Sequence, residues 1–213
     1  MSSEQLIDRM LAAESFVNSW KLRTGQVKEE EDFNRIRDAL ESLSKAPIFI
    51  DDKPGNNILA MRAVARRLKR DRGIGLIIVD YLQLMAPTST KASDSMVQQV
   101  TEISRSLKSL ARELKVPVIA LSQLSRAVET RGGKPRLSDL RDSGSIEQDA
   151  DVVMFIHRED KRNPESDRPN IAEILIEKHR NGPTGKTELY FDEKRATFQP
   201  VDKSGYDELA AEF

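Results

Sequence analysis

Three short runs of apolar residues, each bordered by polar positions, divide the middle of the chain. They are Leu76–Val79, Val116–Leu121 and Val152–Ile156. Continuous apolar runs of this length are typical of strands that are buried on both faces in a parallel sheet. The three runs therefore predict three strands of an α/β core.

Helical periodicity fills the spaces before and between these runs. Apolar residues recur at alternating steps of four and three along one stretch, which predicts a helix through Met96, Val100, Ile103, Leu107, Leu110 and Leu114. Three earlier helices are expected, beginning near Ser2, near Glu29 and after Asn57, and Ser2 has the spacing of a capping box with Gln5. The second of these helices is expected to bury Phe33, Ile36, Ala39, Leu40 and Leu43.

The pattern becomes β-rich toward the end of the chain. Loose alternation predicts a strand at residues 171–178, and a glycine-containing tight turn follows at residues 181–185. A hairpin is predicted next, with its strands at residues 188–191 and 196–201. A further short strand is predicted at Pro47–Asp52. These patterns predict one α/β domain over residues 1–201, with a mostly parallel sheet followed by β-hairpins, and an acidic tail over residues 202–213.

Composition narrows the class of protein. The 213 residues include no cysteine, which excludes a disulfide framework, a thiolate metal site and a cysteine nucleophile. The two histidines, His157 and His179, are far apart and lack the spacing of metal ligands. The net charge is −1 although 32% of the residues are charged, so a nucleic-acid site must be a local patch. The sequence has neither an apolar run of about 20 residues nor a signal-peptide pattern, which predicts a soluble, cytoplasmic protein.

Polar residues directly follow two of the predicted strands. Asp80 ends the first apolar run, and Ser122-Gln123 follows the second. Open α/β sheets bind their ligands at the carboxyl ends of strands, and a carboxylate there is a natural ligand for Mg²⁺ on a nucleotide phosphate. For Asp80 taken alone, a role in a turn or helix cap explains the pattern equally well.

The polar segment Arg141–Asp151 is a candidate nucleic-acid contact. Ser143-Gly144-Ser145 offers backbone N–H groups to phosphate oxygens, and Arg141 adds a positive charge. Four cations precede the segment and favour the same interpretation: Arg126, Arg131, Lys134 and Arg136. The alternative is a structural helix cap over Ile146.

Lys178 and Arg180 lie two residues apart at the end of a predicted strand, before a tight turn. Because side chains alternate along a strand, the two cations are expected to project the same way. Such a pair can reach a phosphate on a neighbouring subunit, as an arginine finger does. An exposed basic hairpin is the alternative, and chemistry alone favours it.

Gly185-Lys186-Thr187 matches the end of a phosphate-binding loop but not the rest of one. Such a loop requires a glycine five residues before Gly185, where this chain has Arg180, and a helix after the threonine. We therefore interpret the segment as a hairpin turn with Lys186 on the surface.

Four stretches together, in this order and spacing, resemble the C-terminal RecA-like motor domain of the DnaB-type replicative DNA helicases: Leu76–Met85, Val116–Arg126, Arg141–Asp151 and Glu177–Gly185. The most specific parts are Gly-Ser-Ile-Glu-Gln-Asp-Ala-Asp and Lys-x-Arg-Asn-Gly-Pro. The resemblance runs from Ser2 to about Val201. It implies a RecA-like P-loop NTPase core within a hexameric helicase that unwinds duplex DNA 5′-to-3′ with ATP and Mg²⁺.

The resemblance also implies roles for individual residues. Asp80 matches the Walker B aspartate that binds Mg²⁺, and Gln123 matches the glutamine that senses the γ-phosphate. Lys178 and Arg180 match a pair that is inserted into the ATP site of the next subunit. The loop that grips single-stranded DNA is matched by Arg141, Asp142 and Gly144.

One part of the family pattern is not found in this sequence. The family places a first strand, a Gly-rich Walker A loop and a catalytic glutamate before the matched region, and an N-terminal domain that docks primase before those. The expectation is an incomplete motor domain that hydrolyses no ATP by itself. Primase and the helicase loader would bind through the missing region or the intact ring, in the cytoplasm at the replication fork. Two alternatives stay open: a catalytically dead DNA-binding and subunit-interaction fragment, or a RecA-like recombination ATPase.

Overall fold

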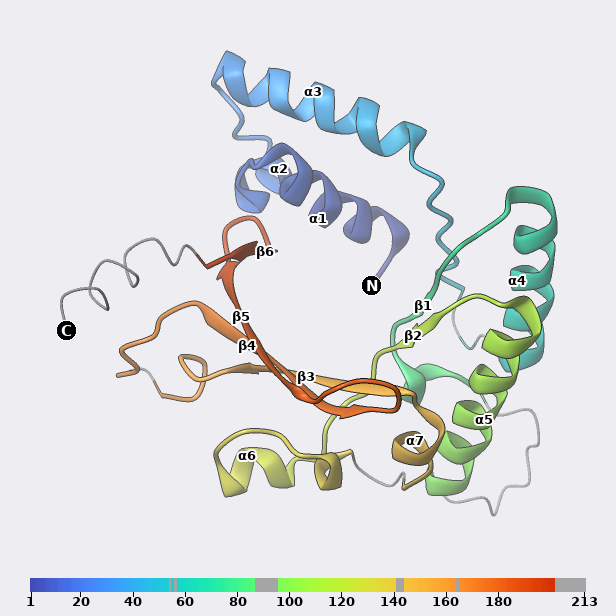
Figure 1. The fold of residues 1–213 in the computed structure, drawn as a ribbon. Helices are drawn as coiled ribbons and strands as arrows, with labels where there is room; N and C mark the ends of the chain where they lie inside the picture. Colours follow the sequence, from blue (N-terminus) through green and yellow to red (C-terminus); the bar gives the residue numbers. More distant parts are fainter. Residues whose placement is uncertain (54, 56, 87–95, 141–143, 164, 202–213) are drawn as a thin grey trace. The chain divides into compact units, whose positions relative to one another are not determined.

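A computed structural model describes residues 1–53, 55, 57–86, 96–140, 144–163 and 165–201 (Figure 1). The elements in chain order are α1 (Ser3–Ser15), α2 (Ser19–Thr24), α3 (Glu30–Lys45), α4 (Ile58–Arg72), β1 (Ile77–Val79), the 3₁₀ turn η1 (Leu82–Leu84), α5 (Met96–Leu114), β2 (Val118–Ala120), α6 (Ala127–Arg131), the 3₁₀ turn η2 (Leu137–Asp139), α7 (Gly144–Asp149), β3 (Val152–Arg158), β4 (Ile171–His179), β5 (Gly185–Asp192) and β6 (Thr197–Pro200). They form two compact units. The first contains residues 1–52, 156–175 and the chain from 185 onward, and the second contains residues 53–155 and 176–184.

The second unit is built on a pair of parallel strands and two long helices. β1 pairs with β2 in parallel, with Ile77 opposite Val118 and Ile78 opposite Ile119. α5 packs against β2 and against α4, which lies beside it (Figure 1). The predicted periodicity of α5 is confirmed, because four of its apolar residues are buried: Val100, Ile103, Leu107 and Leu110.

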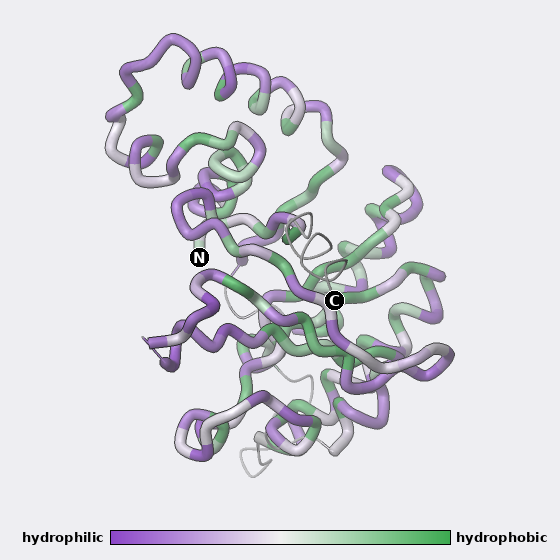
Figure 2. The backbone as a smooth tube through the Cα atoms, turned by 60° about the vertical axis from the view of Figure 1, so that its left-hand side comes forward, coloured by the Kyte–Doolittle hydropathy of each residue, from purple (hydrophilic) through white to green (hydrophobic). Residues whose placement is uncertain are grey.

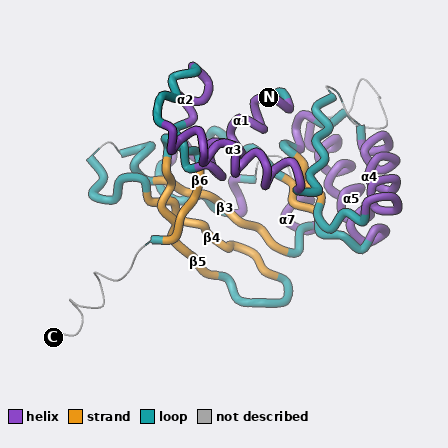
Figure 3. Tube along the Cα trace, turned by 90° about the horizontal axis from the view of Figure 1, so that it is seen from above, coloured by secondary structure: helices purple, strands orange, loops and turns teal. Residues whose placement is uncertain are grey.

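The other strands belong to a separate four-stranded sheet in the order β3-β4-β5-β6, and Figure 3 shows β3, β4 and β5 running side by side. β5 and β6 pair antiparallel, which confirms the predicted hairpin. Phe191 and Phe198 are paired across it with ring centroids 4.9 Å apart. The α/β class is therefore confirmed, although the described strands form two sheets and not one mostly parallel sheet.

α1 and α3 pack together in the first unit. The capping box is present, because the Ser2 hydroxyl accepts from the backbone N–H of Gln5 and the Gln5 side chain accepts from that of Ser2. The expected buried face of α3 is wrong at two positions, since Phe33 is 56% exposed and Leu40 48% exposed. These two share a stripe beside the face of the buried Ala39, and Figure 2 shows hydrophilic and hydrophobic positions alternating along this helix.

The strand predicted at Pro47–Asp52 does not form. The backbone N–H of Ile48 donates to the carbonyl of Ala46 (2.8 Å), which is a local bond and not a bond to a neighbouring strand. Ile48 and Phe49 are accordingly exposed. An apolar run specifies a strand only where a partner strand supplies the backbone hydrogen bonds.

The prediction that the β1 and β2 runs are buried on both faces is also wrong. Ile78 is 62% exposed and Ile119 is 42% exposed, and these cross-strand partners point the same way. The contiguous apolar surface that Ile78 and Ile119 expose promotes association between molecules. No helix among the described residues is long and apolar enough to cross a membrane.

We expect the double variant Ile78→Thr, Ile119→Thr to associate less with itself and to bind less hydrophobic dye than the unchanged chain. Threonine keeps the β-branched shape that suits a strand and removes most of the exposed apolar surface. Sedimentation velocity over a concentration series and dye fluorescence measure the effect. Leu59→Thr is the matched control, because Leu59 is 61% exposed on α4 and lies outside this face. Equal association of the double variant and the control would contradict the prediction.

Candidate functional site

Asp80 and Gln123 lie at the same edge of the parallel pair. The hydrogen bonds of β1 and β2 continue past the strand ends: the N–H of Leu121 donates to the carbonyl of Val79, and the N–H of Leu82 donates to the carbonyl of Leu121, both at 2.9 Å. This ladder holds Asp80 beside the chain that continues into Ser122-Gln123. The carboxylate of Asp80 and the amide of Gln123 are exposed there and can meet a ligand.

Gln83 is a residue of this edge that the sequence interpretation missed. Its Nε2 donates to Ser122 Oγ (3.1 Å), and its Oε1 accepts from the backbone N–H of Gln123 (3.3 Å). The turn η1 places Gln83 three residues after Asp80, so its fork-shaped amide ties the end of β1 to the end of β2. The signal available in the sequence was one polar residue inside the apolar stretch Tyr81–Met85.

Asp80 is the carboxylate that this edge offers to a metal ion. The described part of the chain contains no group of three or more His, Cys, Asp or Glu side chains that could hold a metal. Mg²⁺ is commonly bound through one or two carboxylates, with water and substrate phosphates completing its octahedral shell. Asp80 therefore fits a magnesium ion that arrives with a nucleotide, and it does not fit a metal held by the protein alone.

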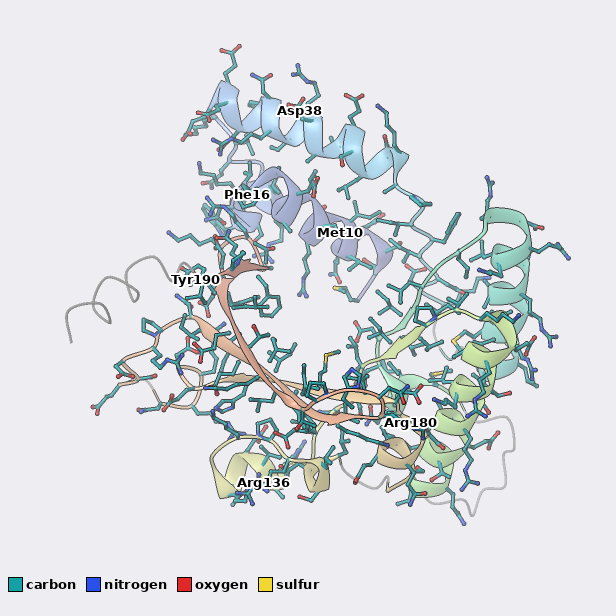
Figure 4. All side chains as sticks on the ribbon, in the orientation of Figure 1. Met10, Phe16, Asp38, Arg136, Arg180 and Tyr190 are labelled. Atoms are coloured by element: carbon teal, nitrogen blue, oxygen red, sulfur yellow. The ribbon has the colours of Figure 1, made fainter. Side chains whose placement is uncertain are left out.

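The segment after Gln123 is organised by Asp139. The buried carboxylate of Asp139 accepts from both Nη atoms of Arg131, at 2.7 and 2.8 Å, and from the backbone N–H of Arg136 at 2.7 Å. The hydrogen bond from Arg131 is the main reason that the pKa of Asp139 lies below its ordinary value, although burial acts in the opposite direction. These hydrogen bonds hold together the basic segment Arg131–Asp139, in which Figure 4 labels Arg136.

Two of the three predicted DNA contacts, Arg141 and Asp142, lie outside the described residues. The third, Gly144, is exposed and is the first residue of the six-residue helix α7. α7 is fastened to α5 by two side-chain hydrogen bonds, between Thr101 Oγ1 and Ser145 Oγ (2.9 Å) and from Ser104 Oγ to Asp149 Oδ2 (2.8 Å). Gly144 is therefore held at one end of a well-anchored helix.

Lys178 and Arg180 both contact the stretch Glu147–Asp151, which contains the end of α7 and the two residues after it. Lys178 Nζ donates to the backbone carbonyl of Glu147. Arg180 contacts Asp151 twice, through its backbone N–H to the carbonyl of Asp151 (2.8 Å) and through Nη1 to Oδ1 (3.0 Å). The two cations thus contact the same short segment of their own chain, and Figure 4 labels Arg180 near α7.

Gly182 permits the turn that follows these cations. A side-chain carbon at Gly182 would lie 2.8 Å from Cε1 of His179, so the imidazole packs directly on the glycine backbone. A larger residue at this position would therefore require the exposed His179 ring to move.

Known proteins are similar to this chain over nearly its whole length. The family model of the DnaB-like helicase C-terminal domain matches residues 1–200. The replicative DNA helicase DnaC of Bacillus subtilis is 50% identical over 204 residues, covering 95% of this chain and 44% of that protein. The replicative DNA helicase DnaB of Rickettsia typhi is 45% identical over 227 residues, covering 98% and 45%. The chain therefore spans less than half the length of these curated relatives.

Two solved structures are similar along almost the whole chain. One is a DnaB-like replicative helicase studied with its interactions with primase, and the other is an ATPase domain. Each has a TM-score of 0.89 and 40% identity over 95% of this chain, which covers 49% of the first structure's chain and 72% of the second's. The resemblance and the RecA-like fold class are confirmed, and the chain belongs to the DnaB-like helicase C-terminal domain family.

Proposed function

We propose that this chain works as part of a hexameric replicative helicase, which unwinds duplex DNA 5′-to-3′ with ATP and Mg²⁺. The match of residues 1–200 to the family carries the proposal. The geometry supports it, because Asp80 and Gln123 share the edge of the sheet where a nucleotide would bind. The match to replicative helicases favours this function over that of a recombination ATPase.

Each residue of the edge has a distinct task in this proposal. Mg²⁺ supplies positive charge to the phosphates, and Asp80 would hold it there. The Gln123 amide would contact the γ-phosphate, and Gln83 keeps the backbone of Gln123 in place through the hydrogen bond to its N–H. A fixed side chain favours catalysis because little reorganisation is needed when charge develops.

The remaining candidates act on a neighbouring subunit and on DNA. Arg180, helped by Lys178, would stabilise the charge on a γ-phosphate bound by the next subunit. Arg141, Asp142 and Gly144 would contact the backbone of single-stranded DNA. Primase and a helicase loader are proposed partners of the ring, which would act in the cytoplasm at the replication fork.

The alternative function is DNA binding and subunit interaction without catalysis. ATP turnover separates the two functions when it is measured for this chain alone and for a chimeric hexamer. In that chimera these residues replace the matching 44% of the Bacillus subtilis relative. Turnover in the chimera supports the helicase function, and an inactive chimera that still forms rings supports the second.

We expect Arg141→Ala to weaken the binding of single-stranded oligonucleotides by a similar factor for every base sequence. A guanidinium and backbone N–H groups contact phosphates, which carry no sequence information. The salt dependence should also become shallower, because one fewer counterion is released. Fluorescence anisotropy with poly-dT and mixed-sequence oligonucleotides at several salt concentrations measures both effects.

The matched control is Arg67→Ala, which removes an exposed cation from α4. It should leave the affinity unchanged. An Arg141→Ala chain with unchanged affinity, or with weaker binding of one sequence only, would remove this residue from the DNA path.

A further inference from the structure

Gln83 and Ser122 together contact both backbone polar groups of Gln123. Gln83 Oε1 accepts from the N–H of Gln123 at 3.3 Å, and Gln83 Nε2 donates to Ser122 Oγ at 3.1 Å. The Ser122 hydroxyl in turn donates to the carbonyl of Gln123 at 3.4 Å. These hydrogen bonds close a ring that holds the peptide groups on both sides of the Gln123 Cα atom.

The chemistry of the groups fixes the direction of the hydrogen bonds in this ring. The N–H of Gln123 can only donate, so the oxygen of the Gln83 amide must face it. Nε2 of Gln83 then faces Ser122 Oγ, which accepts with a lone pair and keeps its own hydrogen for the carbonyl of Gln123. Every donor therefore meets an acceptor, and an apolar side chain at position 83 would break two of the hydrogen bonds at once.

The turn that carries Gln83 is firmly held. Leu82 is only 2% exposed, and its N–H donates to the carbonyl of Leu121 at 2.9 Å. Gln83 is half-buried on this turn, whereas Gln123 is exposed beyond the end of β2. The shorter bonds of the ladder thus set the frame of the edge, and the longer bonds of the ring adjust the position of Gln123 on that frame.

We propose that Gln83 and Ser122 are positioning residues that hold Gln123 toward the γ-phosphate, so that the site discriminates ATP from ADP. This inference rests on the proposed function, in which the Gln123 amide contacts the γ-phosphate. ADP lacks that phosphate, so an error in the position of Gln123 affects the binding of ATP alone. Gln83 and Ser122 contact no nucleotide and act through Gln123.

The first test uses the 213-residue chain labelled with ¹⁵N. In Gln83→Met the backbone N–H of Gln123 should exchange with solvent about 2- to 12-fold faster, which is the net worth of one neutral hydrogen bond. Methionine keeps the length of the side chain and removes its amide. Ser122→Ala should have a smaller effect, because it leaves the bond from Gln123 to Gln83 Oε1.

Gln199→Met is the matched control, because it removes a half-buried amide from β6, outside this edge. It should leave the exchange of the Gln123 N–H unchanged. An exchange rate that is equal in Gln83→Met and in the control would overturn the inference. The proposed function would still stand, since it requires only that Gln123 reach the nucleotide.

The second test measures discrimination in the chimeric hexamer. Gln83→Met should weaken the binding of adenylyl imidodiphosphate, an ATP analogue that is not hydrolysed, by about tenfold and leave the affinity for ADP unchanged. A purely structural role would lower both affinities. In a Gln123→Ala background the same substitution should have no further effect, because the residue through which it acts is absent.

The outcomes separate the inference from the proposed function. Equal losses for the two nucleotides, or an undiminished effect in the Gln123→Ala background, would show that Gln83 acts through the fold and would overturn the inference. A Gln123→Ala chimera that binds the analogue as tightly as the unchanged chimera would instead contradict the proposed contact between Gln123 and the γ-phosphate.

Discussion

Arg180→Ala in the chimeric hexamer should lower ATP turnover by on the order of 10³–10⁵-fold, which is the range over which arginine fingers act. The guanidinium meets charge that develops on the γ-phosphate in the transition state, so its loss affects kcat. ATP affinity should change little, because the ground state is held by other groups. Steady-state kinetics and nucleotide binding at equilibrium measure the two quantities separately.

Arg67→Ala again provides the control for removing one exposed cation from the surface. It should preserve both turnover and affinity. A parallel loss of ATP affinity in Arg180→Ala would place the arginine in the ground-state binding site. An unchanged kcat would show that the segment Lys178–Arg180 is a structural hairpin.

Asp80→Asn should also reduce turnover severely, by roughly 10²–10³-fold, because a neutral amide holds Mg²⁺ poorly and loses electrostatic stabilisation of the phosphates. Raising the Mg²⁺ concentration should recover part of the activity. The isosteric side chain keeps the shape of the edge, so the melting temperature should change little. Kinetics over a Mg²⁺ series and a thermal melt provide the measurement.

The two variants together test whether Arg180 acts on a neighbour. Rings mixed from Arg180→Ala and Asp80→Asn subunits contain interfaces at which an intact Asp80 meets an intact Arg180. Some turnover should therefore return, even though either variant alone is nearly inactive. Mixed rings that form, as shown by native mass spectrometry, and yet stay inactive would contradict action in trans.

The sequence by itself predicted the elements that depend on local patterning. The four-and-three spacing of Val100, Ile103, Leu107 and Leu110 specified α5, because that spacing leaves one continuous apolar face on a helix. The capping box at Ser2 was predicted for the same reason, since all of its partners lie within one turn. The polar ends of two apolar runs placed Asp80 and Gln123 at one edge, where the structure finds them.

Tertiary packing alone decided which apolar residues became buried and which strands formed. Phe33 and Ile78 are large apolar residues of the kind that forms protein cores, but the structure leaves them exposed. The apolar segment at Ile48–Ile50 has no ladder of hydrogen bonds and is not a strand. Whether a residue is buried and whether a strand forms depend on the segment that packs against it. The order of apolar and polar residues along the chain does not show which segment that is.

The supporting contacts of the candidate site were also beyond the reach of the sequence. Gln83 holds the backbone of Gln123 from 40 positions away, and Asp151 meets Lys108 from 43 positions away. Residue types and motif spacing identified the groups that are candidates for chemistry, because those groups have few chemical substitutes. Their positioning residues are ordinary polar side chains, so only the folded chain, which brings distant segments within hydrogen-bonding distance, shows what they do.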